Sequence, residues 1–143
     1  MTDGAGRPDP PTPRPGSLEW LADQHGDAPA IVDAADGRIL TRAEHDAHAT
    51  ALAHGLTAEH GVTSQTRVAV TLASGPDLLV VLYALAKLGA APVLLPPAAP
   101  TGDALALART AGCALLIAGI LLELVGITLE RREEDRKARR TPV

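Results

Sequence analysis

Short apolar runs alternate with amphipathic stretches along most of this chain, and glycine and proline residues stand between them. In its second half, the pattern predicts a strand over 67–72, a helix over 74–88, a strand over 91–95, a helix ending near Ala111 and a strand over 114–117. Both connections are long enough for crossover helices, so we expect the three strands to be parallel neighbours. Their near-continuous apolar character is typical of a sheet covered on both faces.

The first half of the chain shows weaker but similar signals. Ser17 is a suitable N-cap for a helix over 18–25, and an Asp36-Gly37 turn predicts a hairpin between strands over 30–33 and 38–40. Thr41 precedes Glu44 by three residues, which is the spacing of a capping box and predicts a helix from Arg42 to about Glu59. The inner stripe of that helix follows helical spacing and comprises His45, Ala49, Leu52, Ala53 and Leu56.

These elements predict an α/β protein with a small N-terminal hairpin followed by a three-stranded parallel sheet with crossover helices. Residues 1–16 are rich in proline and are expected to form a disordered leader. The α/β segment is expected to span residues 17–119. Residues 120–143 are expected to form a divergent C-terminal helix with a charged tail, because an apolar stripe there runs into mixed charges.

Composition narrows the class of protein. A hydrophobic content of 46% excludes a disordered chain, whereas 1% aromatic residues and a net charge of −4 argue against nucleic-acid binding. The single cysteine, Cys113, lies in an apolar stretch, so we expect a buried, inert thiol and a reducing, cytoplasmic location. Two apolar runs, 78–95 and 114–129, also permit a membrane-associated reading, although Lys87 and Glu123 interrupt them.

Four motifs, taken together, resemble the opening segment of the adenylate-forming superfamily, which comprises acyl-CoA synthetases, peptide-synthetase adenylation domains and luciferases. Residues 40–44 are similar to its L-T-Y-x-E-L signature, and residues 52–56 to its L-A-x-x-L helix. Residues 61–70 are similar to G-V-x-x-G-D-R-V-A, and residues 85–96 to L-K-A-G-A-x-x-V-P-L-x-P. The resemblance runs from about Ser17 to Gly119.

The resemblance implies a reaction in which ATP and Mg²⁺ activate a carboxylate as an acyl-adenylate, which then passes to CoA or a phosphopantetheine carrier as a thioester. The family's Ser/Thr/Gly-rich phosphate loop, its adenine-binding motif, its ribose-binding aspartate and its C-terminal lysine do not occur in this sequence. His45 also stands where the family usually has leucine, and Gln65-Thr66 replaces Gly-Asp. We therefore assign no catalytic, cofactor-binding or metal-binding residue and expect no cofactor on this chain.

Several other residues can be interpreted either as functional or as structural. His45 and His48, with Glu44, could start a metal site, but their directions on the helix favour ordinary histidines. The segment Ser74-Gly75-Pro76-Asp77 could bind an anion through backbone amides, although a capped helix start explains it as well. Lys87 is read as a surface lysine, and Ser64 and Ser74 have no evident catalytic partners.

The leading hypothesis is an N-terminal fragment of an AMP-forming acyl-activating ligase that is inactive alone. A second hypothesis is a non-catalytic assembly module, which pairs with the missing remainder of the enzyme or with itself through exposed apolar faces. A membrane-associated protein is a third. Neither a nucleic acid nor a membrane is expected as a partner.

Overall fold

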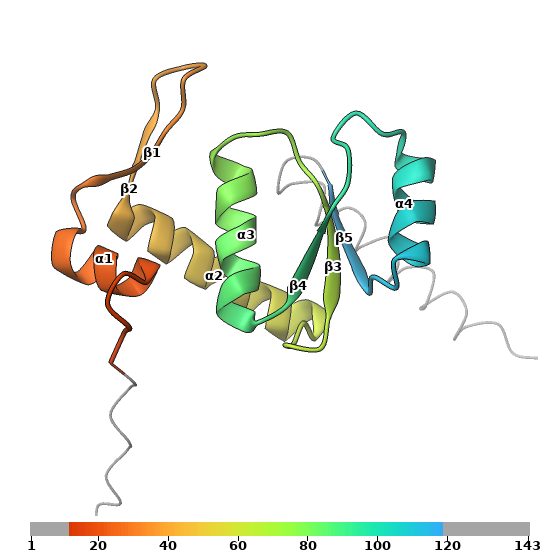
Figure 1. Cartoon of the computed structure of the whole chain (residues 1–143), viewed down its shortest axis with the longest axis horizontal. Coiled ribbons are helices and arrows are strands. Elements are labelled where there is room, and N and C mark those ends of the chain that lie inside the picture. Colours follow the sequence, from red (N-terminus) through yellow and green to blue (C-terminus); the bar gives the residue numbers. More distant parts are fainter. Residues whose placement is uncertain (1–11, 119–143) are drawn as a thin grey trace, which may run out of the picture. The chain divides into compact units, whose positions relative to one another are not determined.

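The computed structural model describes residues 12–118 (Figure 1). Within them the chain divides into two compact units, of which the first ends at Asp46 and the second begins at Ala47. Among the described residues, no helix is long and apolar enough to cross a membrane.

The first unit contains a short helix and a hairpin. Helix α1 (Leu18–His25) begins at Ser17, whose hydroxyl accepts a hydrogen bond from the Trp20 backbone N–H at 3.2 Å. Strands β1 (Pro29–Val32) and β2 (Ile39–Thr41) pair antiparallel. The chain reverses between them at Gly37, whose φ of +75° favours glycine, as the sequence predicts for this turn.

Helix α2 (Arg42–His60) starts with the predicted capping box. The Thr41 N–H donates to the Glu44 carboxylate at 2.9 Å, and the Glu44 N–H donates to the Thr41 hydroxyl at 3.2 Å. The predicted inner stripe of this helix is confirmed, because its members are buried or half-buried: His45, Ala49, Leu52, Ala53 and Leu56.

The second unit is a three-stranded parallel sheet with two crossover helices. Its elements follow the chain as β3 (Arg67–Thr71), α3 (Pro76–Leu88), β4 (Ala91–Leu94), α4 (Thr101–Thr110) and β5 (Leu115–Ala118). The spatial order is β4-β3-β5, so β3 lies in the middle and pairs in parallel with both neighbours. The connection from β3 to β4 and the connection from β4 to β5 run in opposite directions along the sheet. Because both are right-handed, α3 and α4 lie on opposite faces of the sheet (Figure 1).

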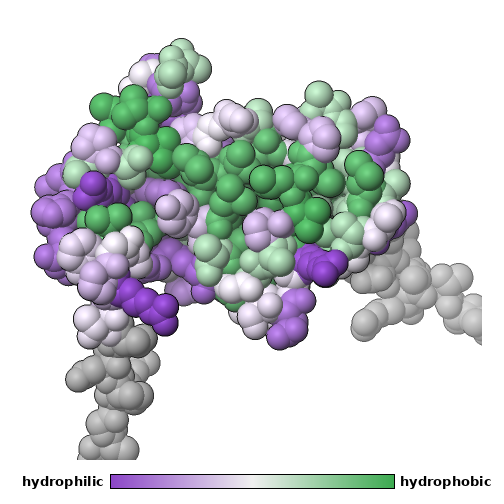
Figure 2. Space-filling model, viewed as in Figure 1, coloured by the Kyte–Doolittle hydropathy of each residue, from purple (hydrophilic) through white to green (hydrophobic). Residues whose placement is uncertain are grey.

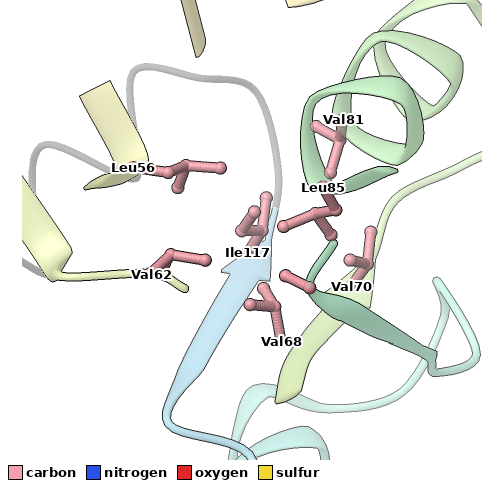
Figure 3. Close-up of a cluster of buried hydrophobic side chains, with 8 residues drawn as sticks. Leu56, Val62, Val68, Val70, Val81, Leu85 and Ile117 are labelled. Atoms are coloured by element: carbon pink, nitrogen blue, oxygen red, sulfur yellow. The ribbon is translucent and has the colours of Figure 1, made fainter. Parts of the chain in front are cut away.

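The face beneath α3 carries the larger core. Val68 and Val70 of β3 point to this face and are almost fully buried. Figure 3 shows Ile117 of β5 between Leu56 and Val62 on one side and Leu85 of α3 on the other. Branched aliphatic side chains therefore fill this layer without any aromatic ring, as the composition requires.

The face beneath α4 is built from small residues. Ala69 of β3 is fully buried and belongs to a cluster with Ala104 and Ala108 of α4 and with Leu116 of β5. Since alanine is short, α4 can approach the sheet backbone closely. The strand β3 therefore alternates large and small residues, with valines toward α3 and alanine toward α4.

The α/β class, the hairpin and the parallel sheet with crossover helices are confirmed, and each element predicted within residues 12–118 is present with ends shifted by at most a few residues. The apolar run over 78–95 is divided between α3 and β4, so it does not form one continuous helix. The predictions for residues 1–11 of the leader and for the tail over 120–143 fall outside the described residues.

Candidate functional site

The candidate site is the edge of the sheet at which the parallel strands end. After β3 the chain passes to α3 on one face, and after β4 it passes to α4 on the opposite face. The two loops therefore diverge above a pair of adjacent strands. Open α/β sheets bind their ligands at such a point, outside the carboxyl ends of the strands.

A hydrogen bond joins the two strand ends at this edge. The Thr71 hydroxyl at the end of β3 donates to the carbonyl oxygen of Pro96 at 3.0 Å. Just below it, the Leu95 N–H donates to the Val70 carbonyl at 2.9 Å, which continues the ladder past the end of β4. The floor of the edge is therefore fixed by one side-chain and one backbone contact.

The start of α3 differs from the capped start that the sequence predicts. Its N-cap is Gly75, which has no side chain and makes no side-chain cap hydrogen bond. Pro76 occupies the first turn, where its missing N–H costs no helical hydrogen bond, and its ring is buried. Ser74 and Asp77 are exposed beside it, so this loop offers backbone amides and one carboxylate.

The charges of the two crossover helices are sorted between the two edges of the sheet. Asp77 and Asp103 lie in the first turns of α3 and α4, both of which begin at the carboxyl edge. Lys87 and Arg109 lie in the last turns of the same helices, at the amino edge. Arg67, at the start of β3, also lies there and donates to the Ala111 carbonyl at 3.1 Å. This distribution matches the dipoles of the two helices.

The carboxyl edge is consequently acidic in the part of the second unit that the structure describes. Its Lys and Arg residues between positions 47 and 118 are Arg67, Lys87 and Arg109, all at the opposite edge. A bound triphosphate requires cations and several backbone donors around its charge. The described residues at this edge therefore do not fit the triphosphate that the resemblance implies, although the strand order makes this edge the expected ligand-binding position.

The other candidates of the sequence do not converge. His45 is 3% exposed whereas His48 is exposed, so the two side chains lie on different flanks of α2. Within residues 12–118 no group of three or more His, Cys, Asp or Glu side chains could hold a metal ion. Cys113 and Lys87 are half-buried, Cys113 against the alanine cluster, and Ser64 is exposed.

Sequence reasoning missed Thr71 and the sorting of charge. The signal for the charge was present, since each crossover helix begins with an aspartate and ends with a basic residue. Thr71 gave no such signal, because its partner is a backbone carbonyl 25 residues away along the chain.

The comparisons with known proteins agree with this architecture. A family model described as AMP-binding enzyme matches residues 18–142. The match therefore continues beyond residue 119, where the resemblance drawn from the motifs ends. No match was found among the curated proteins.

Two solved proteins illustrate the structural likeness. The N-terminal subdomain of NpsA from Klebsiella oxytoca, in complex with 3-hydroxybenzoyl-AMSN, is 25% identical with a TM-score of 0.62, and the match covers 71% of this chain and 25% of that chain. O-succinylbenzoate coenzyme A synthetase (MenE) from Bacillus subtilis, in complex with ATP and magnesium ion, is 24% identical with a TM-score of 0.62. There the match covers 71% of this chain and 27% of that chain. The chain thus spans about a quarter of the length of either structure.

Proposed function

The chain belongs to the family of AMP-binding enzymes, and we propose that it supplies the opening α/β segment of an AMP-forming acyl-activating ligase. The observation that carries this proposal is the β4-β3-β5 sheet with its crossover helices on opposite faces, within a chain that the family matches over residues 18–142. The reaction of the complete enzyme would be ATP-dependent adenylation of a carboxylate followed by thioester formation.

We further propose that the 143-residue chain does not catalyse adenylation by itself. The Lys and Arg residues between positions 47 and 118 stand at the amino edge, so among the described residues none would stabilise at the carboxyl edge the negative charge that develops on a transferring nucleotide. The sequence also contains no Ser/Thr/Gly-rich phosphate loop. ATP, Mg²⁺ and the CoA or carrier thiol would then be held by the rest of the enzyme.

Carboxylate-dependent exchange of pyrophosphate into ATP tests this proposal. We expect the purified chain to give no exchange above background with aliphatic, aromatic or amino-acid carboxylates, while MenE from Bacillus subtilis serves as the positive control. The Leu85→Ala variant, whose core is destabilised, is the control for contamination. It should lower an activity of the chain itself but leave the activity of a contaminating enzyme unchanged. Exchange that is present in the parent chain and reduced in this variant would show that the chain is a catalyst.

The second candidate function is an assembly module, and one feature favours it. Leu79 of α3 and Leu94 of β4 are 37% and 60% exposed, and Figure 2 shows hydrophobic residues gathered over these two elements. Such a surface suits burial against the remainder of the enzyme or against a second copy of the chain. Light scattering after size-exclusion chromatography distinguishes self-association from a monomer. A monomer that also binds no hydrophobic dye would count against any missing partner.

We place the protein in the cytoplasm. The proposal is supported by the single cysteine, which permits no internal disulfide, and by the soluble character of an α/β core. A membrane-associated role remains the third candidate, because part of the apolar run over 114–129 lies outside the described residues. Recovery of the expressed chain in the soluble fraction, without detergent, supports the cytoplasmic proposal, and recovery with the membranes would overturn it.

A further inference from the structure

The hydrogen bonds of β4 reveal which of its residues face the neighbouring strand. The Ala91 N–H donates to the Thr66 carbonyl at 3.0 Å, and the Leu95 N–H donates to the Val70 carbonyl at 2.9 Å. Successive residues of a strand direct their backbone groups to opposite neighbours. The backbone of the odd-numbered residues from 91 to 95 therefore faces β3, and within β4 the backbone groups of Pro92 and Leu94 face the open side.

One of the two outward positions of β4 lacks an N–H group, because it is occupied by Pro92, which is exposed. The other, Leu94, retains its N–H and is 60% exposed. Proline within a sheet is confined to edge strands where the missing N–H would have faced away from the ladder, and edge prolines hinder pairing with another strand.

Strand β5, on the other side of β3, differs from β4 in its outward N–H groups. The Ala114 N–H donates to the Arg67 carbonyl at 3.0 Å, so Leu116 and Ala118 also face β3. The outward residues of β5 are then Leu115 and Ile117, and both carry an N–H group. Among the strands that the structure describes, β4 and β5 thus differ in the N–H groups on their outward sides.

We infer that Pro92 closes the β4 edge to strand addition. The partner that β4 excludes is a second copy of this chain. Two identical edges with an exposed apolar residue would otherwise pair antiparallel across a twofold axis. The inference uses the register of β4 alone and does not depend on the proposed enzymatic role.

Restoring the missing donor tests the inference. In the full chain, the Pro92→Ala variant regains one outward N–H group on an exposed edge and retains every carbonyl. Sedimentation equilibrium should show self-association strengthened about tenfold or more, as expected for the two backbone hydrogen bonds that such a variant would add across a twofold axis. Pro97→Ala is the matched control, because Pro97 lies beyond β4, and it should leave association unchanged.

Two further variants show that the association uses β4. Adding Leu94→Pro to the Pro92→Ala variant removes an outward N–H again and should reverse most of the gain. Pro92→Ser restores the same N–H and should shift association in the same direction, and it serves if the alanine variant does not fold. Equal association of the parent chain and both Pro92 variants, or an equal effect of Pro97→Ala, would overturn the inference.

Discussion

The hydroxyl of Thr71 and the carbonyl oxygen of Pro96 lie 3.0 Å apart and join the end of β3 to the residue that follows the last ladder contact of β4. The contact lies where the chain leaves the sheet for α3 on one face and for α4 on the other. Together with the bond from Leu95 to Val70, it ties the start of one loop to the start of the other at the candidate site.

Removing this hydroxyl should loosen the carboxyl edge. Thr71→Val keeps the shape of the side chain but cannot donate to Pro96, so we expect a loss of about 1 kcal/mol in the free energy of unfolding. Thr71→Ser, which keeps the hydroxyl, should lose less. Urea denaturation followed by far-UV circular dichroism measures both variants, and a serine variant weaker than the valine variant would refute the role of the hydrogen bond.

Two glycines should respond to alanine in opposite directions. Gly89 has a φ of +67°, and a Cβ there would lie 3.3 Å from the Cβ of Ser64, so Gly89→Ala should destabilise the protein by about 1–2 kcal/mol. Gly55 lies inside α2 with no heavy atom within 4 Å of an added Cβ, so Gly55→Ala should stabilise it by roughly 0.5–1 kcal/mol. Thermal melting of the two variants in one buffer shows the sign of each effect.

Because Leu85 and Leu94 differ in burial, truncating them to alanine should lower the free energy of unfolding by very different amounts. Leu85 of α3 is fully buried in the larger core, and its truncation to alanine should cost about 2–5 kcal/mol. Leu94 is 60% exposed, and its truncation should change stability by no more than about 0.5 kcal/mol. Comparable losses in the two variants, measured by denaturant unfolding, would mean that Leu94 is covered in solution.

The capping box should matter for the start of α2. Thr41→Ala removes the acceptor of the Glu44 N–H and should cost about 1 kcal/mol, whereas Thr41→Ser should be close to the parent protein. Amide hydrogen exchange is the suitable measurement, because it reports the first turn of the helix directly. The Glu44 amide should exchange faster in the alanine variant than in the serine variant, and equal rates would contradict the prediction.

Local chemistry made the elements predictable from the sequence. Thr41 with Glu44 marked the start of α2, and Gly89 marked the end of α3, because each acts on residues close to it along the chain. The order β4-β3-β5 was not predicted, because it depends on which face each crossover helix covers. The alternation of Val68, Ala69 and Val70 contains a hint of those faces, but it becomes readable only when the strand pairing is known.

The candidate site was less accessible to sequence reasoning than the fold. The motifs indicated the family, yet the position of the site depends on where two loops diverge, which requires the strand order. Likewise, Pro92 could be read as a strand breaker or as an edge residue until the bond from Ala91 to Thr66 fixed the register. Directional backbone contacts between distant residues are what the sequence pattern leaves open.

The small residues beneath α4 have an energetic consequence. Ala104 and Ala108 are the buried residues of this helix, while Leu105 and Leu107 remain 37% and 47% exposed. Because alanine removes far less apolar area from water than leucine or valine, α4 is held by a weaker driving force than α3. We therefore expect native-state exchange to show α4 detaching in a separate, low-energy opening, before the valine-rich layer unfolds.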